Sequence, residues 1–187
     1  MDAALEQFAE RGYHNTGVAD IAAALRMSHG TFYRYFESKR DILDQLITAL
    51  IGRIAAAVGA EDGPGAAATL AEYRDQVRAI ATALLGVAHE DPRIARVILL
   101  EATGVDGELT ARILDLLDRL RELSSAYLRH GIEAGFLRSD LEIAGTARAL
   151  NGIIYAGALH AIRADGAPGA GQFVDAAVRL MFDGISR

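Results

Sequence analysis

The chain of 187 residues contains no cysteine, no tryptophan, three prolines and a single lysine, Lys39. The absence of cysteine excludes disulfides, thiol catalysis and thiolate metal sites. No uncharged apolar run is long enough to suggest a membrane span. The first residues, MDAALEQF, are acidic and amphipathic, unlike a signal peptide. We therefore expect a soluble, cytoplasmic protein.

The charge is distributed unevenly along the chain. Its net value is −6, which argues against a protein that coats nucleic acid. Residues 1–40 hold five basic and five acidic side chains, so the remaining residues carry the whole net charge. A neutral segment with locally clustered basic groups, joined to an acidic remainder, favours specific docking on DNA over nonspecific coating.

Apolar residues recur at helical spacing along the chain, without a strand pattern or an internal repeat. This predicts an all-α architecture of about nine helices, with an N-terminal three-helix head over 1–45 and a helical body over 46–187. We expect helices over 2–11, 38–58, 92–101 and 108–134, and one that starts at the capping box Ser139-x-x-Glu142 and ends near Arg163.

The stretch from Thr16 to Lys39 predicts two short helices, a tight turn between them, and the start of a longer helix. Gly17 and Asp20 keep half of a capping box, Ser28 caps the second helix, and Ser38 opens the third. The second helix carries an unusual density of hydrogen-bond donors, which suit phosphate oxygens and base edges in a major groove. The alternative is a small helical hairpin with core aromatics and a solvated polar face.

The residues GYHNTGVADIA and SHGTFYRYFESKRDIL closely resemble the N-terminal domain of the TetR family of bacterial repressors, from about Leu5 to Leu46. The resemblance implies that the helix from Ser28 is the recognition helix. It assigns contacts with bases or nearby phosphates to Ser28, His29, Gly30, Thr31 and Arg34, and contacts with the DNA backbone to Tyr33, Tyr35 and Lys39.

Three features depart from the family pattern. Gly17 replaces the usual Thr or Ser, and Arg26 occupies the usual turn glycine, where a side chain either costs ~1 kcal/mol of strain or adds a phosphate contact. Family members also have another helical turn, and often a basic arm, before the residues with which this chain begins.

The resemblance implies a ligand-responsive transcriptional regulator, in our interpretation a repressor that binds a palindromic DNA operator as a homodimer and is released by an unidentified small-molecule effector. The helix over 38–58 is long enough to connect head and body. Two rivals remain: a helical ligand-binding or protein-interaction dimer with weakened DNA binding, and an all-α enzyme with its site in the body.

The last two helices are rich in small residues, which predicts a two-fold interface or, alternatively, close packing inside one subunit. The interface prediction names Gly145, Ala149, Gly152, Ala156, Phe173, Ala177, Leu180 and Met181.

Polar residues on otherwise apolar helices are candidates for an effector pocket, although each alone is equally consistent with an ordinary core or surface position. They are Tyr73, His89, Glu101, Tyr127, His130, Asn151 and Tyr155. We predict no cofactor, no metal site and no catalytic residues, because neither His130-x-x-Glu133 nor His89-Glu90-Asp91 has convergent partners in the sequence.

Overall fold

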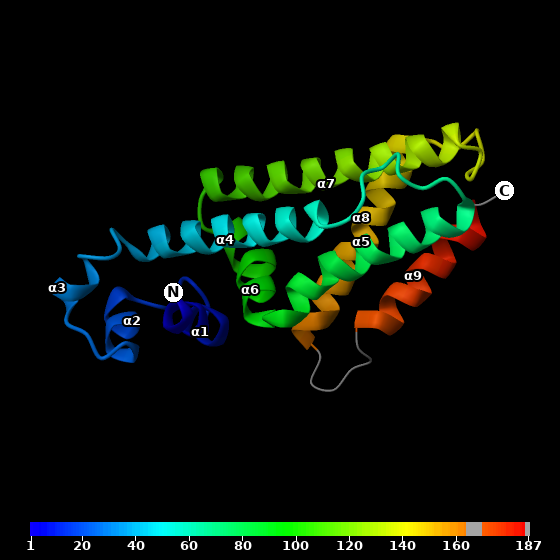
Figure 1. Cartoon of the computed structure of the whole chain (residues 1–187). Helices are drawn as coiled ribbons and strands as arrows, with labels where there is room; N and C mark the ends of the chain where they lie inside the picture. The colour runs from blue at the N-terminus through cyan, green and yellow to red at the C-terminus, as the bar shows by residue number, and fades with distance from the viewer. Residues whose placement is uncertain (164–169, 186–187) are drawn as a thin grey trace.

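The computed structural model describes residues 1–163 and 170–185, so positions 164–169 and 186–187 of the expected body domain lie outside the described residues. Within the described ranges the chain is all-α, as predicted, and forms no strand. Its nine α-helices extend from a small head into an elongated body (Figure 1). They are α1 (Asp2–Arg11), α2 (Val18–Ala24), α3 (His29–Phe32), α4 (Lys39–Gly59), α5 (Leu70–Glu90), α6 (Pro92–Arg96), α7 (Gly107–Glu133), α8 (Ile143–Arg163) and α9 (Ala170–Ile185).

The head consists of α1, α2, α3 and the first turns of α4. Its core forms because the apolar faces of these short helices converge on Phe8, Ile21 and Phe32, which are fully buried. The predicted helix starts are present: the Gly17 N–H donates to Asp20 at 2.8 Å, and the Thr31 N–H donates to Ser28 Oγ at 3.2 Å. The head is therefore held by local capping as well as by burial.

The segment after α2 contains a left-handed turn and a very short helix. The α3 helix is a single turn that ends at Phe32, so Phe36 lies outside it. The two rings still pack, with centroids 5.6 Å apart, because turns after Phe32 bring Phe36 back to the core. Arg26 has a φ of 52°, so the turn adopts the left-handed conformation for which glycine is the usual residue.

The α4 helix joins head and body. Its first half buries Ile42, Leu43 and Ile47 in the head core, and its second half lies against α5 and α7 (Figure 1). By length and composition alone it is apolar enough to cross a membrane. Its partners explain that character, since the helix covers two apolar cores in turn.

The body is a bundle in which α7 packs on α8, while α5 packs on α4, α8 and α9. Two glycines permit the closest approaches. A Cβ on Gly131 would lie 2.7 Å from Leu137, and one on Gly157 would lie 2.7 Å from both Leu85 and Phe173. At Gly157 the side chains of Leu85 from α5 and Phe173 from α9 therefore lie directly on the α8 backbone.

One predicted helix start is wrong, and one predicted helix changes type along its length. The α8 helix begins at Ile143 rather than near Ser139, because the Glu142 carboxylate itself accepts from the N–H groups of Ala144 and Gly145, at 3.0 and 2.6 Å. The helix expected over 92–101 is α6 followed by a π-helical turn, Val97–Glu101, and a short 3-10 helix, Ala102–Gly104. Such π turns are rare and cluster at functional sites.

Candidate nucleic-acid interface and effector cavity

The polar side of α3 faces solvent. Ser28, His29 and Gly30 are exposed, and Thr31 is half-buried. Tyr33 and Tyr35 follow with 56% and 67% of their surface exposed. Tyrosines this exposed contribute little to the core, and their hydroxyls are free to donate to an external partner. Six of the eight residues expected to contact DNA are thus accessible to solvent, and all six lie in or next to α3.

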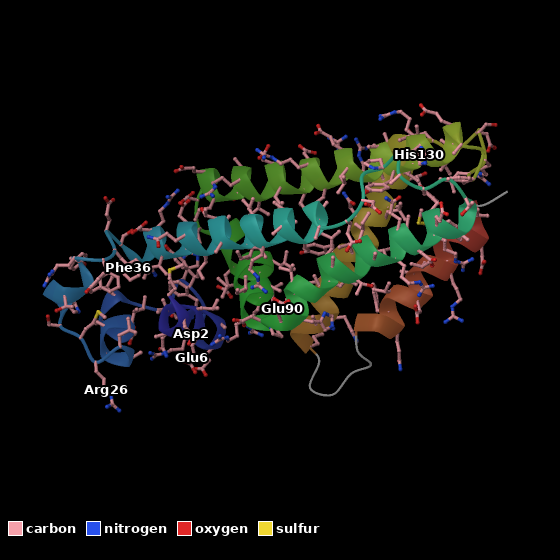
Figure 2. All side chains as sticks on the ribbon, viewed as in Figure 1. Asp2, Glu6, Arg26, Phe36, Glu90 and His130 are labelled. Atoms are coloured by element: carbon pink, nitrogen blue, oxygen red, sulfur yellow. The ribbon has the colours of Figure 1, made fainter. Side chains whose placement is uncertain are left out.

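Two arginines extend this surface. Arg34 and Arg26 are exposed, and neither forms an ion pair with any residue that the structure describes. Figure 2 shows Arg26 pointing away from the protein at the end of the head. Free guanidinium groups beside a helix N-terminus suit the phosphate oxygens of a DNA backbone.

Lys39, the eighth residue, is placed differently. Its ammonium group donates to the backbone carbonyls of Tyr13 at 2.8 Å and Thr16 at 2.9 Å, and lies 4.3 Å from the centroid of the Tyr13 ring. Two of its three N–H groups therefore have partners inside the head. Lys39 ties the start of α4 to the segment between α1 and α2, and only its third N–H is left for the expected phosphate contact.

Glu101, expected in the effector pocket, instead contacts the head. The Tyr13 N–H donates to Glu101 Oε2 at 3.2 Å, and the same carboxylate lies beside Gly12. Tyr13 is thus held from two sides, by Lys39 through its carbonyl and by Glu101 through its amide. This residue is the point where the π turn of the body meets the head.

An apolar cavity of about 200 Å³ lies inside the body. Leucine, isoleucine, valine and alanine side chains from α4 to α9 and from the π turn form most of its wall. On α7 the lining residues run from Ile113 to Leu128, and fifteen residues of helix correspond to about 22 Å. The cavity wall therefore follows α7 over about 22 Å, a length suited to an extended apolar chain.

The predicted pocket residues divide into two groups. Tyr73, Tyr127, Asn151 and Tyr155 line the cavity. The other three lie outside its lining. Besides Glu101, His89 bonds to the Leu85 carbonyl through Nδ1 at 2.9 Å, and His130 bonds to the Ala67 carbonyl through Nε2 at 3.1 Å.

The polar groups at the wall are mostly satisfied by the protein itself. The Tyr73 hydroxyl donates to the Tyr127 carbonyl at 3.0 Å, and the Tyr127 hydroxyl donates to the Asp62 carbonyl at 2.7 Å. Burial raises the pKa of Tyr73, so its hydroxyl stays protonated. Ser124, which was not among the predicted pocket residues, bonds to Asn151 Oδ1 at 2.9 Å. Only spatial proximity to Asn151 reveals it.

The expected interface residues also divide. Gly145, Ala149, Gly152 and Ala156 form an exposed stripe on α8, and Leu180 of α9 is 67% exposed. The other three face the interior of their own subunit: Met181 is 7% exposed, Ala177 lines the cavity, and Phe173 lies against Gly157. The inner face of α9 forms the subunit core, so these residues are occupied there.

Among the described residues, no three His, Asp or Glu side chains lie close enough to hold a metal ion. The arrangement offers two binding features instead: an exposed polar surface on the head and an apolar cavity in the body, about 22 Å long on α7.

Known proteins resemble this chain both in its head and over its whole fold. Residues 1–46 match the family model described as bacterial regulatory proteins of the tetR family. The fatty acid metabolism regulator protein of Bacillus subtilis (strain 168) is 27% identical over 143 residues, which cover 76% of this chain and 71% of the relative.

Solved structures cover the whole fold. The TetR family transcriptional regulator PfmR from Thermus thermophilus superposes with a TM-score of 0.81 and 26% identity, covering 100% of this chain and 98% of PfmR. FadR from Bacillus subtilis, solved in complex with stearoyl-CoA, gives a TM-score of 0.75 and 23% identity, with 98% and 96% coverage. These relatives are transcriptional regulators rather than enzymes. The helix-turn-helix head, the helical body and the matched residues together place this chain in the TetR family of bacterial transcriptional regulators.

Proposed function

We propose that the protein is a cytoplasmic repressor that binds a palindromic DNA operator as a homodimer and releases it when a small apolar effector enters the body. The observation that carries this proposal is the pairing of a solvent-facing donor surface on α3 with an apolar cavity, joined by α4. The proposed boundary between head (1–45) and body (46–187) falls within α4, so that one helix belongs to both.

The dimer is proposed from the outer face of α8 and α9. Single exposed apolar side chains are common, but here Leu180 accompanies a stripe of exposed small residues that allows close helix approach. A two-fold axis through this stripe makes a four-helix interface. Two heads then bind half-sites about 34–36 Å apart, one turn of duplex.

The effector is proposed to be a long apolar chain. Compact polycyclic molecules need width, whereas this cavity follows α7 for fifteen residues with mostly aliphatic walls. The stearoyl-CoA complex of the structurally similar FadR supports the same class of effector, a long acyl chain. Each methylene moved from water into such a cavity contributes about 0.8 kcal/mol, which is ample to drive binding.

We propose that the response passes through the π turn as well as through α4. Ile98 and Leu99 of this turn line the cavity, and Glu101 of the same turn accepts the Tyr13 N–H. A chain that displaces Ile98 or Leu99 therefore acts on Tyr13 and, through it, on Lys39. A coupling of about 1–3 kcal/mol changes operator affinity 5- to 150-fold.

The test is selection of DNA from a random pool with the full-length protein, followed by anisotropy titrations of the recovered duplex with and without palmitoyl-CoA. We expect a palindromic consensus, nanomolar-range binding, and release by palmitoyl-CoA. Arg34→Ala should weaken specific binding by about 1–3 kcal/mol and relax one consensus position, since Arg34 is free to reach a base or its phosphate.

Two outcomes contradict the proposal. Enrichment of no sequence above background, at low salt, removes the DNA-binding role. It favours the alternative of a helical ligand-binding or protein-interaction dimer whose head has weakened DNA affinity, for which Gly17 and Arg26 are the departures to examine. An operator complex that is unchanged by acyl chains of any length removes the proposed effector class and leaves the DNA-binding role intact.

A further inference from the structure

A second hollow opens between α7 and α8 and adjoins the apolar cavity. It is lined by Leu117, Asp118, Arg121, Arg148, Asn151, Gly152 and Tyr155. Leu117, Asn151 and Tyr155 also line the cavity, so the two spaces share a wall. We refer to this hollow as the mouth, because it adjoins the cavity at these three residues and opens to the surface between α7 and α8.

The rim of the mouth is apolar where a chain has to pass. Leu117 and Tyr155 are 37% and 38% exposed, and Leu114 one turn earlier on α7 is 55% exposed. Exposed apolar side chains cost free energy that burial against a bound apolar group removes. Leu117 and Tyr155 line both spaces, so an alkyl chain that passes from the mouth into the cavity would cover them.

The outer part of the mouth is basic, although the residues after position 40 carry the whole net charge of −6. Arg121 is positioned by Asp118, with Nη2 and Oδ1 3.1 Å apart. Arg148 is exposed and forms no ion pair or hydrogen bond with any residue in the described ranges. Two guanidinium groups at one opening, one of them free, suit an anionic oxygen group.

Asn151 lies between the apolar and basic parts. Its Oδ1 accepts from Ser124, and its Nδ2 has no hydrogen-bond partner among the described residues. Because the Asn151 amide is half-buried and its Nδ2 has no partner there, it favours a ligand oxygen at the boundary between the apolar and basic parts. An acyl carbonyl, located where an apolar chain meets its polar head group, supplies such an oxygen.

We propose that this mouth is the head-group site of an anionic amphiphile: its alkyl chain fills the cavity, its acyl oxygen meets Asn151, and its anionic group binds Arg148 and Arg121. The inference rests on the proposed apolar effector and adds the chemistry of its polar end. A fatty acid carboxylate and the phosphates of an acyl-coenzyme A share this anionic chemistry.

Calorimetric titrations of the full-length protein distinguish a fatty acid carboxylate from acyl-coenzyme A phosphates as the anionic group. The three probes are palmitate, palmitoyl-CoA and the uncharged 1-hexadecanol, each below its critical micelle concentration. The variants are Arg148→Met, Arg121→Met and the double variant. Arg119→Met is the matched control, since Arg119 lies on the same helix, is 70% exposed, and pairs with Asp115 outside the mouth.

We expect the double variant to weaken binding of the anionic probes by at least about tenfold, as expected for loss of charge-assisted hydrogen bonds, and to leave hexadecanol unchanged. A loss for palmitoyl-CoA only assigns the site to phosphates, and a loss for both assigns it to any anionic group. Raised salt should weaken the anionic probes in the wild type and have little effect in the double variant.

Equal affinities of wild type and double variant for both anionic probes overturn the inference, as does an equal loss for hexadecanol. Sedimentation of the variants checks that the dimer is intact, since Gly152 belongs both to the mouth and to the exposed stripe on α8. If hexadecanol binds and releases DNA while the arginines have no effect, the proposed function survives and the head-group site fails. If no probe binds, the effector part of the proposed function fails.

Discussion

Head and body use charge in opposite ways. In the head, a charged group links separate segments: the half-buried Lys39 ammonium donates to two carbonyls and faces the Tyr13 ring. In the body, the centre is an apolar cavity, and charged side chains lie at its outside, as in the pair formed by Arg78 and Asp175. The head should therefore be sensitive to removing a charge, and the body to adding one.

The difference follows from size. The helices of the head are short, α3 being a single turn, and part of its apolar core is supplied by the body, namely by Val97, Ile98 and Leu109. Capping and charge-assisted hydrogen bonds add to the order of this small unit. The body has long amphipathic helices and enough apolar surface to keep a cavity open between them. We therefore expect the body to bind an apolar partner and the head to bind a polar one.

The largest expected effect is the addition of a charge inside the body. Gly157→Glu places a carboxylate where a Cβ alone would lie 2.7 Å from Leu85 and Phe173. We expect a loss of at least about 3–5 kcal/mol in the free energy of unfolding, because an unpaired charge is buried in a close helix contact. Circular dichroism during urea denaturation measures it.

Ala156→Glu is the matched control, because Ala156 is the next residue along α8 and is exposed. Its helical content should be kept, while the proposed dimer should dissociate in sedimentation and lose operator affinity. A folded dimer of Ala156→Glu with full operator binding would mean that the two-fold axis lies on other helices.

The next largest effect is removal of the charge from the head. Lys39→Met keeps the aliphatic stem and deletes the donors to Tyr13 and Thr16. We expect a loss of about 2–3 kcal/mol in unfolding free energy, since hydrogen bonds from charged donors contribute about 1.5–3 kcal/mol. Chemical denaturation measures the loss. Arg34→Met, which removes an exposed charge with no internal partner, should change stability by less than about 0.5 kcal/mol.

Equal stabilities for Lys39→Met and Arg34→Met would end the proposed contrast between head and body. In that case Lys39 acts chiefly at the DNA surface, and its variant should instead lower the magnitude of the salt slope of DNA binding by about one. The two measurements on one variant thus separate its internal role from its external role.

The sequence predicts the helices of this fold well, because their signals are local. Caps such as Ser28 and Ser38 and the 3.6-residue periodicity depend only on neighbours along the chain. The error at the start of α8 has a local cause as well. A cap at Ser139 would accept from the N–H groups of residues 141 and 142, whereas the Glu142 carboxylate accepts from those of Ala144 and Gly145 and so starts the helix three residues later.

The candidate sites were harder to predict, since they depend on which helix faces meet in space. Glu101 and Lys39 look like ligand-binding residues in the sequence, yet both bond to Tyr13, which is distant from each along the chain. The cavity wall escaped prediction for a different reason. A leucine that lines a cavity and a leucine in a filled core have the same periodicity, and only the packing of several helices separates them.

A smaller effect is expected at the joint between the two regions. Glu101→Ala removes the acceptor of the Tyr13 N–H, while Glu101→Gln keeps an oxygen in the same place. Anisotropy titrations with and without palmitoyl-CoA should show that Glu101→Ala lowers the effector response several-fold and leaves operator affinity without effector within about threefold. Glu101→Gln should respond almost as the wild type does. An undiminished response in Glu101→Ala would leave α4 as the whole route of coupling.

The smallest effect is expected at the end of the head, where Arg26 has a φ of 52° and an exposed guanidinium. Arg26→Gly relieves about 1 kcal/mol of left-handed strain, but glycine also gives the unfolded chain about 0.4–1 kcal/mol of conformational freedom, so the net stability change should be below about 1 kcal/mol. Arg26→Ala keeps the strain and should be the less stable of the two. Both variants lose the same charge, so both should lower the magnitude of the salt slope by about one and retain the wild-type consensus. Unchanged slopes in both would show that Arg26 does not reach a phosphate, and the polar surface of the head would then be confined to α3 and the two tyrosines after it.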